Sequence, residues 1–133
     1  MDAPVVAVSN DGTVGVAWMD MRAGKGNRDV VWTAGKPGRF AAEVRASDDG
    51  AGTQGHPSLA FDRAGTLWCA WEDARGGVDA QGIHVADFRS KKDVALSASS
   101  EGKCAFPCLC ARRDGLAVAY ETPAGVSMRA VAR

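Results

Sequence analysis

The sequence predicts an all-β fold that is built from three copies of one structural unit. Pro4, Pro57 and Pro107 open three similar segments and lie 53 and then 50 residues apart. Each segment holds a short apolar run, a glycine-containing turn and a second apolar run that ends in an aromatic residue. A period near 50 residues is typical of repeat architectures. No segment has the sustained 3.6-residue periodicity that indicates a helix.

Each unit is predicted to begin with a β-hairpin. Short apolar runs flank a turn whose glycine supplies the positive φ that tight turns need. The three predicted hairpins span residues 4–18 with a turn at Asn10-Asp11-Gly12, 57–71 with a turn at Asp62-Arg63-Ala64-Gly65, and 107–120 with a turn at Arg113-Asp114-Gly115.

Further strands are predicted to follow each hairpin. Apolar residues alternate with polar ones or form short β-branched runs, which favours strands. Third strands are expected at 29–34, 82–86 and 125–131, and fourth strands at 39–45 and 92–97. The third unit ends before a fourth strand. The chain of 133 residues is therefore expected to form a single domain of three units, at approximately 4–56, 57–106 and 107–133.

Four meandering strands per unit, with apolar residues on both faces of the inner strands, describe a blade of a β-propeller. The predicted innermost strands carry small residues in alternation, as the crowded centre of a ring requires. These residues are Val5, Ala7, Ser58, Ala60, Cys108 and Cys110. A single continuous β-sandwich is the alternative, although sandwich strands do not usually repeat in groups of four.

Two units carry a motif that resembles the repeats of bacterial sialidase-like, BNR-type propellers. The motif is Trp18-Met19-Asp20-Met21-Arg22 followed by Asp29-Val30-Val31 in the first unit. It is Trp71-Glu72-Asp73-Ala74-Arg75 followed by Asp79 and Ile83 in the second. Repeats of that family read roughly P-x-hydrophobic-x-x-D-G, then A-W-x-D-x-R, then D-I. The resemblance implies a propeller fold and says little about catalysis.

The chain also departs from this family pattern. In the third unit Tyr120-Glu121-Thr122 replaces W-x-D, and the arginine is missing. The segment Ser47–Thr53 is similar to the family's Asp box (S-x-D-x-G-x-T-W), but Ala51 and Gln54 stand where glycine and tryptophan are expected. This segment also falls between units. We interpret it as a weak match to the Asp box.

Three blades are too few to close a ring, because single-chain propellers have four to eight. An open arc would leave two apolar blade faces in water, and such faces usually mark an interface. We therefore expect a homodimer that closes a six-bladed ring about a two-fold axis. Three chains that form nine blades, or a different partner, are the alternatives.

The long connections of the predicted blades lie at one end, and they are a candidate binding face. They span residues 21–28, 47–56, 74–81 and 98–106. The candidate binding residues there are Asp20, Arg22, His56, Asp73 and Arg75. Paired Asp and Arg side chains could hold a carbohydrate or a small polar ligand by bidentate hydrogen bonds. The other interpretation is that each pair ties down the loop of its own unit.

The repeated aromatic residues Trp18, Trp71 and Tyr120 are expected to pack between blades, with a sugar-stacking platform as the alternative. Trp32 and Trp68 lie within apolar strands and are expected in the core.

The cysteines suggest a metal cluster, but their spacing favours another interpretation. Cys104, Cys108 and Cys110 lack a C-x2-C pair, so zinc is the less favoured option. Cys108 and Cys110 lie two apart on a predicted strand and are expected to be small buried thiols. Cys104 is expected in a loop, where it could be oxidised. The cysteines weakly favour a reducing compartment.

Composition and motifs exclude several functions. Sixteen basic and sixteen acidic residues cancel, which disfavours nucleic acid and anionic membranes as partners. The first residues lack the pattern of a signal peptide, so a cytoplasmic location is expected if the chain is complete. No catalytic residue, cofactor or metal site is predicted.

The resemblance implies what a sialidase-like site would need: three arginines, a tyrosine nucleophile with a supporting glutamate, and an aspartate. Tyr120 is the only tyrosine, and Glu121 is expected on the opposite face of its strand. The sequence therefore favours a non-catalytic propeller module that assembles into a ring and binds a ligand or a protein. The alternative is a fragment or degenerate relative of a sialidase-like glycosidase with carbohydrate recognition.

Overall fold

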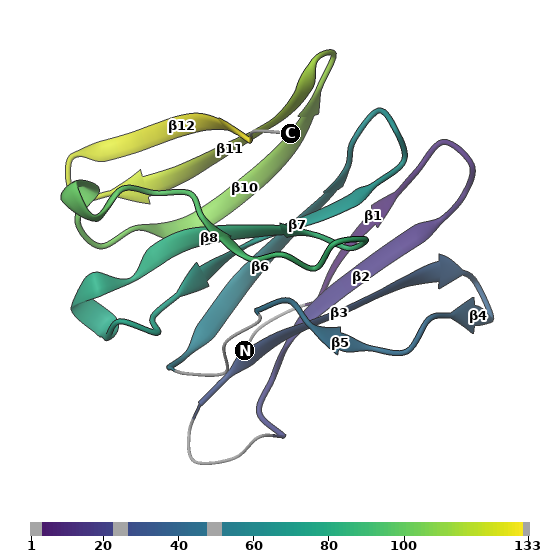
Figure 1. The fold of residues 1–133 in the computed structure, drawn as a ribbon, viewed down its shortest axis with the longest axis horizontal. Coiled ribbons are helices and arrows are strands. Elements are labelled where there is room, and N and C mark those ends of the chain that lie inside the picture. The colour runs from purple at the N-terminus through teal and green to yellow at the C-terminus, as the bar shows by residue number, and fades with distance from the viewer. Residues whose placement is uncertain (1–3, 23–26, 48–51, 132–133) are drawn as a thin grey trace.

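The computed structural model describes residues 4–22, 27–47 and 52–131, and the all-β prediction is confirmed over these residues (Figure 1). The described chain contains only two short 3₁₀ turns besides its strands, Val78–Ala80 (η1) and Ser99–Glu101 (η2). None of the described helical segments is long and apolar enough to cross a membrane.

The strands form three antiparallel sheets in chain order. Sheet 1 contains β1 (Val5–Val8), β2 (Val14–Asp20), β3 (Asp29–Lys36), β4 (Arg39–Phe40) and β5 (Val44–Arg45). Sheet 2 contains β6 (Gln54–Phe61), β7 (Leu67–Asp73), β8 (Gly82–Asp87) and β9 (Val94–Ala95). Sheet 3 contains β10 (Ala105–Arg112), β11 (Gly115–Thr122) and β12 (Gly125–Val131).

The outer strands differ most from the predicted ones. The strand expected at 39–45 is two short pieces, β4 and β5, which both pair with β3. Between them the Thr33 hydroxyl donates a hydrogen bond to the carbonyl of Ala41, so a side chain holds the segment where the ladder is interrupted. β9 is also shorter than the predicted 92–97.

The hairpin turns lie at the same end of all three sheets, at the upper right in Figure 1. Gly12 and Gly65 have φ values of +82° and +80°, which confirms the predicted need for glycine. In the second turn the Asp62 carboxylate accepts hydrogen bonds from the backbone N–H groups of Ala64 and Thr66. It also accepts one from the indole N–H of Trp68.

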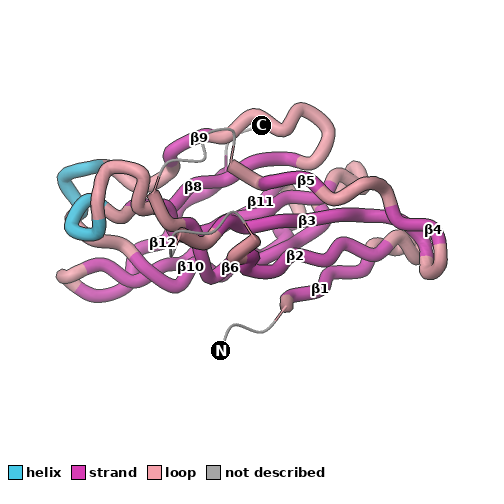
Figure 2. Tube along the Cα trace, turned by 90° about the horizontal axis from the view of Figure 1, so that it is seen from below, coloured by secondary structure: helices cyan, strands magenta, loops and turns pink. Residues whose placement is uncertain are grey.

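Sheet 2 lies between the other two sheets and is buried on both faces. The innermost strands β1, β6 and β10 are neighbours, and the sheets fan out from them (Figures 1 and 2). Leu67, Cys69 and Trp71 of β7 belong to the core shared with sheet 1. Ala70 of the same strand and Ile83 of β8 belong to the core shared with sheet 3. One strand therefore supplies two cores through the alternation of its side chains.

The repeated aromatic residues share a direction. Trp71 packs towards sheet 1, and Tyr120 packs towards sheet 2. Both are at most 1% exposed, so packing between sheets is confirmed for these two residues. Trp18 lies on the face of sheet 1 that points away from sheet 2 and is half-buried. Glu121 is exposed on the other face from Tyr120, as expected.

The expected burial of Cys108 and Cys110 is wrong, because both are exposed. They lie on the face of sheet 3 that points away from sheet 2, where none of the three described sheets covers them. Cys104 lies in a loop, as expected, but it is fully buried, which disfavours the expected oxidation. Burial raises the pKa of its thiol, which disfavours the reactive thiolate.

We expect Trp71→Ala to destabilise the fold by about 3–5 kcal/mol, because it removes a fully buried indole from the core between two sheets. Denaturant unfolding followed by circular dichroism measures the change. The matched control is Trp18→Ala, whose indole occupies the same repeat position but is half-buried, and which should cost clearly less. Equal costs would contradict the packing argument.

Candidate functional site

The Trp-x-Asp-x-Arg motif of sheet 2 forms a continuous set of hydrogen bonds at the end of β7. The indole N–H of Trp71 donates to Asp73 over 2.9 Å. Asp73 also accepts from the backbone N–H of Arg75 at 3.0 Å and from its side-chain Nε at 2.9 Å. The motif thus satisfies a buried indole and closes the loop that follows it.

The first unit repeats this arrangement at the end of β2. Trp18 donates to Asp20 over 3.2 Å, and Asp20 accepts from both the backbone and the Nε of Arg22 at 2.8 Å. Arg22 also pairs with Glu43 at 2.5 Å. The same bonds in two units favour the interpretation that each pair ties down its own loop.

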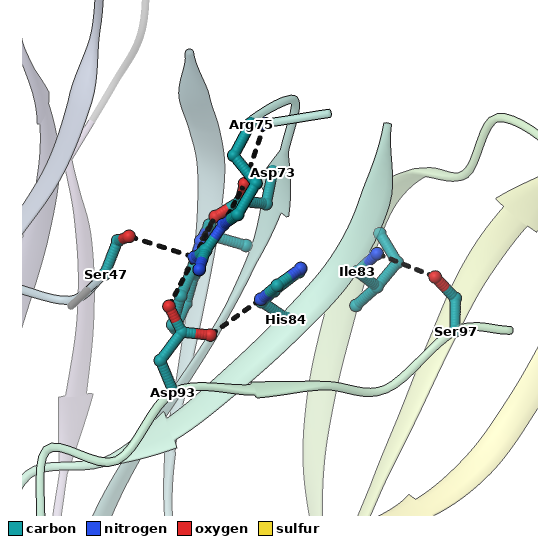
Figure 3. A network of polar contacts seen from close by, with 8 residues as sticks. Ser47, Asp73, Arg75, Ile83, His84, Asp93 and Ser97 are labelled. Carbon is teal, nitrogen blue, oxygen red and sulfur yellow. Dashed lines mark hydrogen bonds and ion pairs between the residues drawn. The ribbon is translucent and has the colours of Figure 1, made fainter. Parts of the chain in front are cut away.

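In sheet 2 the motif extends into a larger ion network (Figure 3). Arg75 bridges Asp73 at 2.7 Å and Asp93, and its guanidinium donates to the Ser47 hydroxyl at 3.0 Å. The Nδ1 of His84 lies 2.6 Å from the second oxygen of Asp93. The network therefore joins β7, β8 and the segment before β9 to the end of the first unit.

The two arginine networks differ in burial. The side chains of Asp73 and Asp93 are 0% and 1% exposed, and that of Arg75 is 25% exposed. The side chain of Arg22 is 66% exposed. An ion pair in water contributes little to stability, whereas a buried charge depends on its partner. The sheet 2 network is therefore a structural element of the fold.

The pKa values of this network follow from burial and hydrogen bonding. Burial of Asp73 raises its pKa, but hydrogen bonds from Arg75 and Trp71 outweigh this effect and lower it. Asp93 behaves in the same way, with hydrogen bonds from His84 and Arg75 that lower its pKa to about 2. The hydrogen bonds that Arg75 donates to Asp73 raise the pKa of Arg75.

Three residues of the network have the chemistry of metal ligands. Ligand atoms of Asp73, His84 and Asp93 lie within 4.8 Å of one another. The guanidinium of Arg75 already bridges the two carboxylates, so a metal ion would have to displace a cation that both carboxylates bind. These residues fit an internal ion network better than a metal centre.

Clefts lie beside both arginine networks. A cleft of about 430 Å³ adjoins Asp73 and Arg75, between the β7–β8 connection and the segment 95–102. A smaller one of about 200 Å³ adjoins Asp20 and Arg22. A larger cleft of about 640 Å³ lies at the opposite end among the hairpin turns, and Arg63 contributes to its wall. Cleft size alone therefore does not favour the end with the long connections.

A second constellation lies where the inner strands begin. His56 and Phe106 have positive φ values of 47° and 52°, which are unusual for residues with side chains. Each precedes a repeat proline, and the strand pairing of β6 and β10 shifts there as in a β-bulge. Bulges and strained backbone cluster at functional sites.

Glu72 joins these two bulge residues. Its carboxylate oxygens lie 2.9 Å from Nδ1 of His56 and 2.7 Å from the backbone N–H of Phe106, which donates to it. The rings of His56 and Phe106 are in contact, with centroids 4.8 Å apart. The carboxylate at Nδ1 favours the tautomer that leaves Nε2 of His56 as a hydrogen-bond acceptor. The constellation thus combines an exposed aromatic ring with an oriented imidazole.

Sequence reasoning identified His56 but missed Glu72 and Phe106. The structure does not bring His56 into the networks of Asp20, Arg22, Asp73 and Arg75. Alignment of the repeats could have indicated Phe106, because it precedes Pro107 as His56 precedes Pro57.

At the corresponding position of the third unit, different residues form a hydrogen-bond and ion-pair network. The hydroxyl of Tyr120 donates to Glu101 at 2.8 Å and accepts from Arg129 at 2.9 Å, and Arg129 pairs with Glu101. Burial raises the pKa of Tyr120. A neutral, hydrogen-bonded phenol fits a structural role. Of the segment that is similar to an Asp box, residues 48–51 lie outside the described part of the chain.

The structure of the Hadza microbial sialidase Hz136 is similar to this chain, with a TM-score of 0.64 and 12% sequence identity. The match covers 94% of this chain and 34% of the sialidase, so the chain spans about a third of that protein's length. At this identity the similarity establishes the fold alone, which is a sialidase-like β fold. No protein-family model matches the chain. The search of curated proteins also finds no match.

We expect Arg75→Ala to destabilise the protein by about 3–5 kcal/mol, because it leaves two buried carboxylates without their cation. Arg22→Ala is the matched control at the same repeat position and should cost at most about 1 kcal/mol, since its side chain is exposed. Urea unfolding of both variants tests this. A larger loss for Arg22→Ala would contradict the assignment.

Acid should destabilise the fold through the same network. The lowered pKa of Asp93 means that the folded chain binds this proton less readily than the unfolded chain. Its stabilisation is complete above its ordinary pKa of about 4 and is lost as the pH falls towards about 2. Unfolding free energies measured between pH 6 and pH 2 test this. Asp93→Asn should show a shallower decline, and an unchanged decline would place the acid sensitivity elsewhere.

Proposed function

We propose that this chain is a non-catalytic β-propeller module that self-assembles into a ring and binds a ligand or a protein at the end with the long connections. Its three sheets are three consecutive blades of that propeller. The observation that carries this proposal is the order of the sheets, which stack in chain order with β1, β6 and β10 innermost and sheet 2 covered on both faces.

The binding part of the proposal rests on the His56–Glu72–Phe106 constellation. These residues lie at the entry of the inner strands, where the blades converge. Phe106 is 55% exposed and the side chain of His56 is 42% exposed. An exposed ring beside a hydrogen-bonding imidazole suits a hydroxyl-rich ligand such as a carbohydrate. Recognition by such uncharged contacts should depend little on salt.

A non-catalytic role is supported by how the candidate groups are used. Asp73, Arg75 and Tyr120 are engaged in ion pairs and hydrogen bonds within and between the units. The second candidate function is residual carbohydrate recognition in a fragment or degenerate relative of a sialidase-like glycosidase. The similarity to a microbial sialidase favours this alternative.

An immobilised glycan array tests the binding proposal. We expect His56→Ala to weaken binding to the best glycan about tenfold, which corresponds to one lost hydrogen bond. Arg63→Ala, in the cleft at the opposite end, is the matched control and should leave binding unchanged. Loss of binding with Arg63→Ala alone would place the site among the hairpin turns. Absence of any glycan binding would overturn carbohydrate as the ligand class.

A fluorogenic sialoside separates the two candidate functions. The non-catalytic module should release no more fluorophore than buffer does. Turnover that is lost in His56→Ala would establish the glycosidase alternative.

A further inference from the structure

We propose that two copies of this chain dock head to tail, with the open face of sheet 1 of each copy packed on the open face of sheet 3 of the other. The inference rests on the proposed propeller and identifies which surfaces meet. Both open faces are defined by positions that are buried elsewhere in the same chain.

The chain contains two examples of the proposed contact. Sheet 2 packs on sheet 1 through Leu67, Cys69 and Trp71, and sheet 3 packs on sheet 2 through the same repeat positions. The corresponding residues of sheet 1 are Val14, Val16 and Trp18. These three are half-buried and face away from sheet 2. We call this surface, with Val6 and Val8, the leading face.

The inner strand shows the contrast clearly. Val6 and Val8 of β1 are 59% and 63% exposed. The residues that match Val6 in the next two units, Leu59 and Leu109, are 9% and 6% exposed because each meets the preceding sheet. The leading face therefore has the apolar side chains of a sheet contact.

Sheet 3 has the complementary surface. In sheets 1 and 2, the residues that pack against the following sheet are at most 3% exposed. They are Val30 and Trp32 of sheet 1 and Ile83 and Val85 of sheet 2. Val126 and Met128 of sheet 3, at the same repeat positions, are 77% and 73% exposed. We call this surface, with Cys108 and Cys110, the trailing face.

A polar contact joins each of the first two units to the next unit, and the third residue of this series lies on the trailing face. The Met19 sulfur accepts the backbone N–H of His56 from the next unit at 3.3 Å. Glu72 accepts that of Phe106 in the same way. Glu121 is the third member of this series and is exposed. It is therefore available to accept a backbone N–H from an incoming unit.

Head-to-tail pairing repeats a contact that the fold already makes, whereas pairing of like faces has no example among the described sheets. Two copies give six blades, which lies within the range of closed propellers. The pairing then closes about a two-fold axis and leaves no open face. It also brings a second His56–Glu72–Phe106 constellation to the same mouth of the ring.

Charge insertion tests the pairing. Val6→Arg disrupts the leading face and Met128→Arg the trailing face. Light scattering should give twice the chain mass of 13.8 kDa for the wild type and a single chain mass for either variant at micromolar concentration. Val78→Arg is the matched control, since Val78 is 65% exposed outside both faces, and it should remain dimeric.

An equimolar mixture of the two variants gives the decisive result. Each retains one intact face, so the mixture should form a heterodimer through one undamaged contact. Like-to-like pairing predicts that only one variant is monomeric, and that outcome would overturn the inference. A monomeric wild type would overturn both the inference and the proposed self-assembly.

The native thiols report which face is covered. Cys108 and Cys110 are exposed in the single chain, and Cys69 and Cys104 are buried. With 5,5′-dithiobis(2-nitrobenzoate), two thiols should react rapidly in Val6→Arg, and at least tenfold more slowly in the wild-type dimer. A dimer with fast thiols would leave self-assembly standing but would overturn the head-to-tail inference.

Discussion

The packing of each sheet on its neighbour is the constraint on which the rest of this structure depends. A strand sends alternate side chains to opposite faces, so β7 fills one core with Trp71 and another with Ala70. The sheets approach closely: a Cβ on Gly15 would lie 2.6 Å from the side chain of Leu67. Sheet 2 cannot bury its apolar residues without a sheet on each side, which sheets 1 and 3 provide.

The ion network is a consequence of this packing. A buried indole needs an acceptor for its N–H, which Asp73 supplies. The buried carboxylate in turn needs a cation, which Arg75 supplies, and Asp93 and Ser47 bind the same guanidinium nitrogen that pairs with Asp73. The spacing of Trp-x-Asp-x-Arg thus follows from the need to satisfy one polar group, the indole N–H, at the edge of a core. The motif therefore recurs with the unit.

The sequence predicted local features well because they depend on residues close together in the chain. The inner strands and the turns at Gly12 and Gly65 are of this kind. The exposure of Cys108 and Cys110 could not be predicted from the strand pattern, since it depends on which sheet comes last. The contact of Glu72 with Phe106 depends on a bulge and on the register between two units, 34 residues apart in the chain.

Comparison of the repeats distinguishes residues that stabilise the fold from positions whose side chains vary. Residues that recur, such as Trp71 and Asp73, satisfy needs that every unit has, and a change there damages the fold. His56 and Phe106 share one backbone position and one strained φ but carry different side chains. Because that backbone N–H is held by Glu72 in one unit and by the Met19 sulfur in the other, the side chains can differ without cost to the sheets. The positions before the repeat prolines can therefore carry different side chains while the packing of the sheets stays the same.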